Sequence, residues 1–369
     1  MSDSGRFLAL SALAGAPTSR VPVGILTWGY EYYWKVANFE PWRLCCGSNA
    51  DWERAHRALC DRHEPDIVFY SGAGTGDRPP RIVDDNREYW TVEDGNSGRR
   101  IRLIKSSLTQ VDIETGKKPN DSVGVIRSTA DADRRIPRFT GIGNAYLEGL
   151  SSLIDYCGDR ALVLPHHSPG YVCACYALGF TDAMTMMIED RDLFIYVADL
   201  YAAGDDLRMK QLAGAGAQAI YIADGWASVD IISPSMFREF ALPYQKSMVE
   251  SARRHGLKAI LWNEGDVVPI LRDEASIPWD AFGMEQPRKG IDLDLSHLRR
   301  EVGPARCIFG NFDSETLLVS GSRSEIRRGV DEQMEKSGSG NPLVFCTGSP
   351  VPSNASPEAI DWMIEAVRA

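Results

Sequence analysis

The sequence has no uninterrupted apolar run of the roughly 18 residues that a membrane span requires. Its first residues, MSDSGR, also lack the apolar segment of a secretory signal. Basic residues are too few to provide a surface for polyanions, because 40 Lys and Arg stand against 51 Asp and Glu and leave a net charge of −11. Nucleic acid and anionic membranes are therefore not expected as partners. We expect a cytoplasmic protein.

Several motifs that mark common catalytic sites are missing. The eight cysteines form no C-x-x-C pair and are too sparse for a disulfide scaffold in 369 residues. No H-E-x-x-H motif, nucleophile elbow or P-loop is present. The nearest glycine-rich segment, residues 72–76 (GAGTG), is followed by Asp-Arg-Pro-Pro instead of a helix. This argues against a doubly wound dinucleotide-binding fold.

The sequence does contain a regular alternation of short apolar runs and amphipathic stretches. Eight runs are predicted strands: 21–28, 66–72, 160–166, 217–224, 258–264, 281–285, 306–312 and 342–348. Helices are expected near 233–254, 293–302, 322–336 and 357–368. Strands that alternate with helices form right-handed βαβ units, and eight such units close a barrel. We predict an α/β fold, a single (β/α)8 TIM barrel over residues 1–369.

Between about residues 73 and 159 the pattern changes to an alternation of apolar and polar residues. Examples are residues 88–92 (EYWTV), 100–104 (RIRLI) and 111–113 (VDI). A period of two indicates strands, and Asp94-Gly95 is a typical hairpin turn. We predict a β-hairpin insertion after barrel strand two that lies over the active face.

Polar residues at the C-terminal ends of the strands form the active site in barrels of this kind. Three carboxylates at these ends are predicted to be catalytic, namely Glu264, Asp224 and Glu285. The residues predicted to contact a substrate are Trp28, Tyr30, Trp262, Asn263, His167, Arg288 and Asn311. An acid after a strand can instead cap the next helix, which is our interpretation of Asp313. Glu264 is the central candidate, because Asp266 is better placed as the cap.

Three segments resemble the uroporphyrinogen decarboxylase superfamily. Residues 232–246 (ISPSMFREFALPYQK) are similar to its SP-x-x-F-x-E-F-x-x-P-Y segment, and residues 310–313 (GNFD) match its GN-hydrophobic-D element. Residues 347–352 (TGSPVP) stand where the superfamily has a late TGC stretch. The likeness covers residues 217–369 well and the N-terminal part weakly. It implies the same barrel.

The resemblance implies one of two kinds of chemistry. One branch of the superfamily decarboxylates uroporphyrinogen III without a cofactor, but its Arg-Gln-Ala-Gly-Arg signature is absent here, where residues 26–30 read LTWGY. The other branch moves methyl groups among corrinoid proteins, coenzyme M and methoxylated aromatics, usually with zinc. A sub-branch similar to aromatic O-demethylases has His-Ser-Asp-Gly-Asp where residues 262–266 read WNEGD. The acid is therefore kept as Glu264, and Trp262 replaces the histidine.

This replacement bears on the metal, because an indole offers only an N–H donor and cannot ligate zinc. Glu264 with His166 or Cys346 could rebuild a site for zinc or another divalent metal. Our lead hypothesis is a methyltransferase or demethylase for a small methylated compound, aromatic or otherwise apolar, with a corrinoid protein as the methyl carrier. The alternatives are a cofactor-independent decarboxylase or lyase and a non-catalytic ligand-binding barrel. A homodimer is left open.

Overall fold

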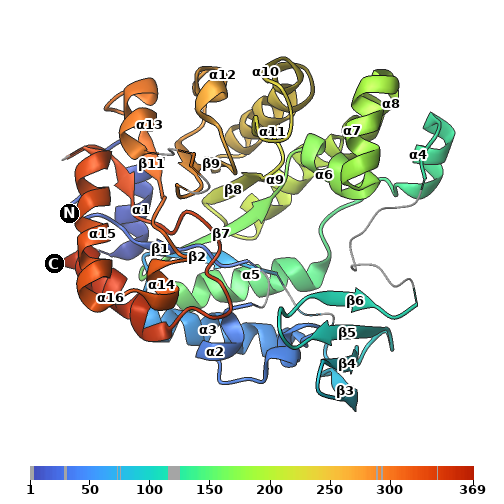
Figure 1. Cartoon of the computed structure of the whole chain (residues 1–369), viewed down its shortest axis with the longest axis horizontal. Helices are drawn as coiled ribbons and strands as arrows, with labels where there is room; N and C mark the ends of the chain where they lie inside the picture. Colours follow the sequence, from blue (N-terminus) through green and yellow to red (C-terminus); the bar gives the residue numbers. More distant parts are fainter. Residues whose placement is uncertain are drawn as a thin grey trace.

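Eight parallel strands form the centre of the molecule (Figure 1). The computed structural model describes residues 4–28, 31–72, 74, 76–114, 125–287, 290–291, 294–338 and 340–369. In sheet order the strands are β1 (Gly24–Ile25), β2 (Ile67–Tyr70), β7 (Leu162–His167), β8 (Ala219–Asp224), β9 (Lys258–Asn263), β10 (Ala281–Met284), β11 (Cys307–Phe309) and β12 (Leu343–Val344). The last strand returns to the first, since Val23 pairs with Phe345 and the Gly24 N–H donates to the Phe345 carbonyl at 2.8 Å. The predicted (β/α)8 barrel is confirmed.

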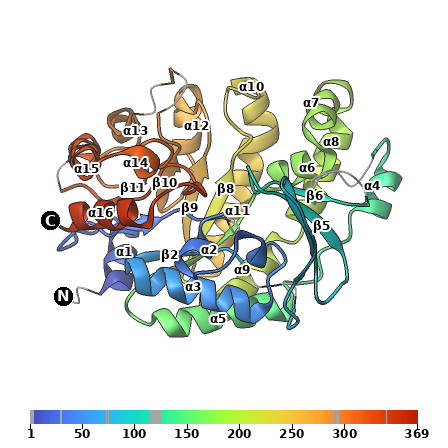
Figure 2. The same ribbon diagram turned by 60° about the horizontal axis from the view of Figure 1, so that its bottom comes forward.

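Helices surround the barrel and cover its N-terminal end (Figures 1 and 2). The connections after β1, β2 and β7 carry α2 (Tyr33–Val36), the 3-10 turn Pro41–Leu44, α3 (Asn49–His63), α5 (Asn144–Cys157), α6 (Gly170–Leu178), α7 (Phe180–Glu189), α8 (Arg191–Ala202) and α9 (Asp205–Gly214). Those after β8 carry α10 (Pro234–Met236), α11 (Leu242–Arg254), the 3-10 turn Val268–Ile270, α12 (Leu271–Ala275), α13 (Leu295–Val302), α14 (Leu317–Ser320), α15 (Arg323–Ser337) and α16 (Pro357–Arg368). α1 (Gly5–Leu13) closes the barrel from below, because its Ala9, Ala12 and Leu13 join the side chains of the barrel interior. Among the described residues no single helix has the length and apolarity of a membrane span, and α6 and α7 meet that test only as a pair bent by 113°.

Two separate cores lie on the two faces of the closed sheet. The interior core contains Tyr221, Ala223 and Trp262, whereas the outer core contains Ile222 and Leu261 from the same two strands together with the helices. Successive side chains of a strand point to opposite faces. A residue's position within its strand therefore decides whether it can reach the barrel mouth.

One predicted helix is interrupted by a wider turn. The helix expected over residues 233–254 begins at Ser233, whose hydroxyl accepts from the Met236 N–H at 3.2 Å, and Pro234 follows in the first turn. Residues Phe237–Ala241 form a π-helical turn before α11 begins. Pro243 has no N–H to donate to the carbonyl four residues earlier, which explains why regular α-helical bonding stops here.

The insertion after β2 is a four-stranded antiparallel sheet followed by a short helix. β3 (Arg81–Asp85), β4 (Tyr89–Glu93), β5 (Arg100–Ile104) and β6 (Gln110–Asp112) pair in chain order. α4 (Thr129–Arg135) lies against α8, where the Tyr196 hydroxyl donates to Asp133 at 2.8 Å. Figure 1 shows the sheet and α4 on the right of the barrel. α5 packs on α3 and β7 as a barrel helix, so the insertion ends before α5 and not near residue 159.

Gly283 on β10 gives Trp262 its space. A Cβ at Gly283 would come within 2.9 Å of the Phe309 carbonyl oxygen and within 2.9 Å of Trp262 Cδ1. Gly283→Ala should therefore lower the free energy of unfolding by about 1–3 kcal/mol through overpacking and shift tryptophan fluorescence. The matched control is Gly214→Ala at the end of α9, where a Cβ meets nothing within 4 Å. Equal urea midpoints for the two variants would contradict this account.

Candidate active site

The alternation along the strands turns six side chains toward the inside of the barrel and its mouth. Five of them lie at the C-terminal ends of β1, β7, β9 and β10 or within three residues after them, and the sixth is the third residue of β8: Trp28, His166, Trp262, Glu264 and Glu285, and Tyr221. Trp262 and Tyr221 belong to the interior core, and Trp28 packs against it. Five of the six stand among the predicted site residues, and Tyr221 does not.

Aromatic rings form the floor of this mouth. Trp28 stands edge-on to Trp262 with ring centroids 5.3 Å apart, and edge-on to Tyr221 at 6.2 Å. It also stacks on His166 at 6.0 Å. Trp262 and Tyr221 are buried beneath, while Trp28 and His166 keep partial exposure. The part of this floor that faces the mouth is therefore the stacked pair of Trp28 and His166, whose rings lie at 25° to each other.

Three buried polar atoms of this floor have no hydrogen-bond partner in the described part of the chain: Trp28 Nε1, His166 Nδ1 and the Tyr221 hydroxyl. Burial raises the pKa of the Tyr221 phenol well above its usual value and lowers the pKa of His166. Both side chains are therefore neutral near pH 7. A buried polar atom without a partner costs free energy, and a bound ligand or water would relieve that cost. Three such atoms in one ring cluster make this floor a candidate binding surface.

Glu264 lies at the edge of the floor, half-buried, directly after β9. A Cβ on Gly225, at the end of neighbouring β8, would come within 2.9 Å of Glu264 Oε2. The glycine thus leaves room for the carboxylate. Gly265 follows with a φ of +77°, a conformation that favours glycine and turns the chain sharply after the acid.

Glu285 holds the loop that carries Glu264. Its Oε2 accepts from the Gly265 N–H at 3.0 Å, and its Oε1 accepts from the Ser349 hydroxyl at 3.2 Å. Asn311 donates to the Glu285 carbonyl at 2.8 Å and accepts from Gln333 at 2.9 Å. Glu285 is 1% exposed. These bonds tie the ends of β9, β10, β11 and β12 together and give Glu285 and Asn311 positioning contacts within the protein.

Two predicted residues point away from the mouth. Asp224 and Asn263 occupy outward positions of β8 and β9 and join a buried network with the helix layer. Gln245 of α11 donates to Asp224 at 2.8 Å and to Glu274 of α12 at 3.4 Å, and Asn263 donates to Glu274 at 2.8 Å. Asn263 also accepts from the Glu264 N–H at 2.8 Å. The structure thus places Asp224 and Asn263 behind Glu264, where they support the loop and cannot touch a substrate in the mouth.

His167 also faces outward. It lies 4.0 Å from Asp205, beside Arg208, and burial followed by the Arg208 charge lowers its pKa well below the usual value. The remaining predicted contacts, Tyr30 and Arg288, lie outside the described residues.

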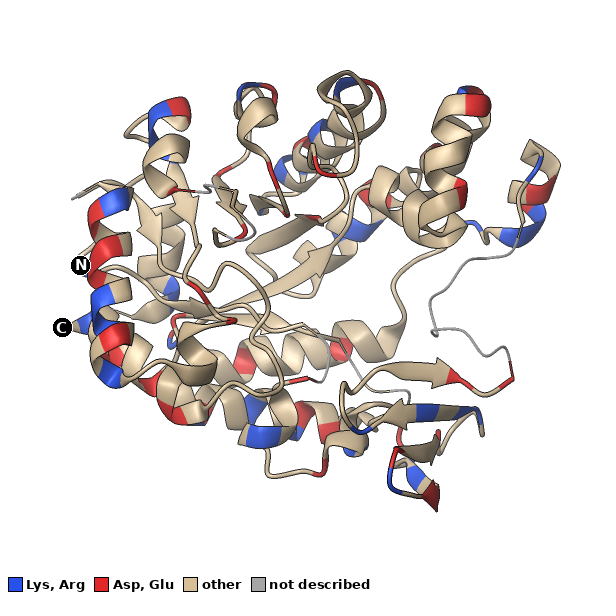
Figure 3. Cartoon of the chain, in the orientation of Figure 1, with Lys and Arg blue, Asp and Glu red and all other residues tan. Residues whose placement is uncertain are grey.

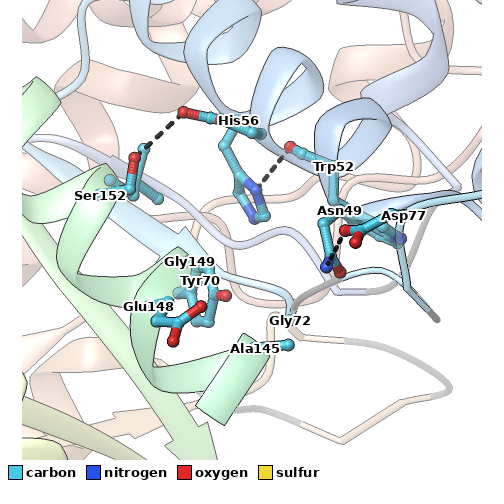
Figure 4. A pocket seen from close by; sticks show the side chains of 12 residues that line it. Asn49, Trp52, His56, Tyr70, Gly72, Asp77, Ala145, Glu148, Gly149 and Ser152 are labelled. Atoms are coloured by element: carbon cyan, nitrogen blue, oxygen red, sulfur yellow. Dashed lines mark hydrogen bonds between the residues drawn. The ribbon is translucent and has the colours of Figure 1, made fainter.

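A cavity of about 300 Å³ lies outside the barrel, between α3, α5 and the end of β2 (Figure 4). His56 at its wall donates from Nδ1 to the Trp52 carbonyl at 2.8 Å and accepts at Nε2 from the Ser71 N–H at 3.2 Å. Burial lowers the pKa of His56 to about 4, so the ring is neutral. No predicted site residue lines this cavity.

Comparison with known proteins identifies the family of this chain but does not identify its reaction. The family model of uroporphyrinogen decarboxylase (URO-D) matches residues 109–369, which is more than half of the chain. The chain belongs to the uroporphyrinogen decarboxylase family. Uroporphyrinogen decarboxylase of Neisseria gonorrhoeae is 28% identical over 237 residues, which is 60% of each chain. That of Gluconobacter oxydans is 26% identical over 254 residues, 67% of this chain and 70% of the relative. The chain thus aligns with about 60% of the length of the Neisseria relative.

Solved structures show the same fold. A methyltransferase from Methanosarcina mazei superposes with a TM-score of 0.71 at 19% identity, covering 99% of this chain and 98% of that one. A B12-independent methionine synthase from Shewanella sp. W3-18-1 gives a TM-score of 0.53 at 13% identity, covering 95% of this chain and 98% of that one. At these identities the likeness concerns the barrel alone. The family therefore establishes an enzyme superfamily and leaves methyl transfer and decarboxylation unseparated.

The zinc site that the resemblance implies does not fit the side chains of this URO-D family member. Among the described residues no three His, Cys, Asp or Glu side chains are grouped closely enough to hold a metal ion. Cys346 lies fully buried in the interior core, and burial raises the pKa of its thiol to about 12. A thiol ligates as the thiolate, which this environment disfavours. Glu264, His166 and Cys346 are therefore not brought together as a ligand set.

The unpartnered Tyr221 hydroxyl gives a first test of the site. Tyr221→Phe should leave the free energy of unfolding unchanged or raise it by up to about 1 kcal/mol, because it removes a buried group that bonds to nothing in the described chain. Tyr33→Phe is the matched control: this buried hydroxyl donates to the Phe69 carbonyl at 2.8 Å and contacts Thr27 at 3.0 Å. Its loss should cost about 1–3 kcal/mol. The free energies of unfolding of the two variants are measured by urea titration. An equal loss of stability in both would contradict a ligand-facing Tyr221.

The network behind Glu264 predicts a dependence of stability on pH. Burial, the largest cause, raises the pKa of Asp224 to about 7 and that of Glu274 to about 8. Unfolded carboxyls titrate near 4. Between pH 4 and 8 the folded state therefore holds more protons than the unfolded state, so stability falls as pH rises, by at most about 1.4 kcal/mol per pH unit for each group. Asp224→Asn should flatten this slope in urea titrations from pH 5 to 8. Asp182→Asn on exposed α7 should leave it unchanged, and an unaltered slope in Asp224→Asn would refute the assignment.

Proposed function

We propose that this member of the URO-D family transfers the methyl group of a small methylated compound, of aromatic or otherwise apolar character, bound at the barrel mouth. The observation that carries the proposal is the neutral aromatic floor with its three unpartnered polar atoms. A flat methylated ligand would stack on the partly exposed rings of Trp28 and His166. The methyltransferase with the same fold supports the proposal at the level of the barrel.

In the proposed reaction Glu264 would act as the general acid. Transfer of the methyl group breaks the bond between the methyl carbon and the substrate oxygen and forms a bond from that carbon to a nucleophilic acceptor. The oxygen then takes a proton, and the Glu264 carboxyl at the edge of the floor would supply it. The proposed acceptor is a reduced corrinoid, carried by a partner protein. Glu285 and Asn263 would keep the Glu264 loop in place through their bonds to the Gly265 and Glu264 amides.

The test is a single-turnover assay of the full chain with a reduced corrinoid and a panel of methoxylated aromatics. We expect a demethylated product by mass spectrometry, and Glu264→Gln should slow its formation by about 100-fold or more while ligand binding changes little. Glu315→Gln, an exposed acid after β11, is the matched control. Absence of transfer over the whole panel would contradict the proposal.

The same samples separate the alternatives. Release of carbon dioxide from a carboxylated substrate would favour the decarboxylase that the curated relatives are named for. Tight binding of an unchanged ligand, equal in Glu264→Gln, would indicate a binding protein.

A further inference from the structure

Two cysteines from different parts of the chain meet on the outer side of the barrel. Cys60 lies in the last turn of α3, and Cys157 is the last residue of α5. Their Sγ atoms are 3.6 Å apart across 97 positions of sequence. α3 and α5 pack along each other below the barrel in Figure 1. We propose that Cys60 and Cys157 are a site of reversible intramolecular disulfide formation, with a small disulfide compound as the oxidant.

The geometry favours this pair over the other thiols. A disulfide has an S–S distance of about 2.05 Å, so the two sulfurs, now 3.6 Å apart, need to approach by about 1.5 Å. Cys45 and Cys46 are also neighbours, but consecutive Cα atoms are about 3.8 Å apart and a disulfide normally spans about 4.4–6.8 Å. All eight cysteines are described, and all are free thiols in the structure.

A cavity gives a reagent access to the pair. It has a volume of about 260 Å³, and both cysteines, Arg160 and Arg368 line it. The side chains themselves are only 5% and 2% exposed, so reaction requires entry through this cavity.

The two thiols are not equivalent. The contact with the other sulfur lowers the pKa of Cys157 and raises that of Cys60, while burial raises and the Arg160 charge lowers the pKa of both thiols. We assign the first attack to Cys157, and the exchange gives the same disulfide if Cys60 attacks first.

The exchange balances in two steps. The Cys157 thiolate attacks one sulfur of the small disulfide, forms a mixed disulfide and releases one thiolate of the reagent. Cys60 then loses its proton and attacks the Cys157 sulfur, which releases the second reagent thiol. Two protein thiols are oxidised and one small disulfide is reduced to two thiols.

The bond would enclose the whole insertion. The segment between Cys60 and Cys157 contains β2, the β3–β6 sheet and α4. A cross-link across so long a loop restricts the unfolded chain strongly, so oxidation should raise the thermal midpoint.

The experiment treats the reduced full chain with hydroxyethyl disulfide and counts thiols. We expect the count to fall from eight to six, a linked Cys60–Cys157 peptide in the unreduced digest, and a rise of about 5 °C in the melting midpoint that dithiothreitol reverses. Cys60→Ala and Cys157→Ala should abolish the rise, whereas Cys173→Ala should retain it.

Eight remaining thiols, or a reagent bound to one cysteine with no linked peptide, would overturn the proposal. The peptide map of the unsubstituted chain decides this even if a variant fails to fold.

Discussion

The closed sheet imposes one constraint on which the whole site depends: neighbouring residues of a strand face opposite sides. On β9 this sends Trp262 inward, Asn263 outward and Glu264 toward the mouth. The outward residue is not idle, because its amide holds both the Glu264 backbone and the Glu274 carboxyl of the helix layer. A shift of one position would exchange these roles and place an amide in the mouth and an indole among the helices. Register is therefore what places Glu264 at the mouth as a candidate site residue.

The same alternation sorts the carboxylates by function. Asp224 is fully buried on the outer face and Glu285 is almost fully buried at the mouth, and each is bonded by neighbouring donors. Glu264 is the half-buried member, so it alone of the three combines the mouth with contact to solvent. Because burying an acid costs free energy unless it is hydrogen-bonded, the other two acids bond to neighbouring elements. These bonds connect β8 to α11 and α12, and the end of β9 to β10 and β12. A rigid rim around one accessible acid is what proton transfer to a bound ligand requires.

The barrel could be predicted from the sequence because each strand is an apolar run and each helix an amphipathic stretch. The hairpin insertion could be predicted because apolar and polar residues alternate there with a period of two. It also contained the signal that separates Asp224 from Glu264. Interior and outer residues alternate, so counting back from Asp224 and Glu264 to the aromatic residues Tyr221 and Trp262 places them on different faces. What the sequence could not show is partnership across the fold: Gln245 and Glu274 behind Asp224, Ser349 against Glu285, or the absent Cβ of Gly283 beneath Trp262. Such contacts join residues tens of positions apart and depend on the barrel's closure.

Trp262 affects both the metal site and the shape of the floor. The resemblance places a histidine where this chain has an indole, and the structure shows that the indole fills space that Gly283 leaves empty and supports Trp28 edge-on. The tryptophan thus takes away a possible metal ligand and at the same time supplies one of the aromatic rings of the floor. A metal would polarise a substrate by charge, whereas the proposed methylated ligand would be held by contact with the aromatic rings of this floor. In the proposed reaction, Glu264 at the edge of the floor would supply the proton to the substrate oxygen.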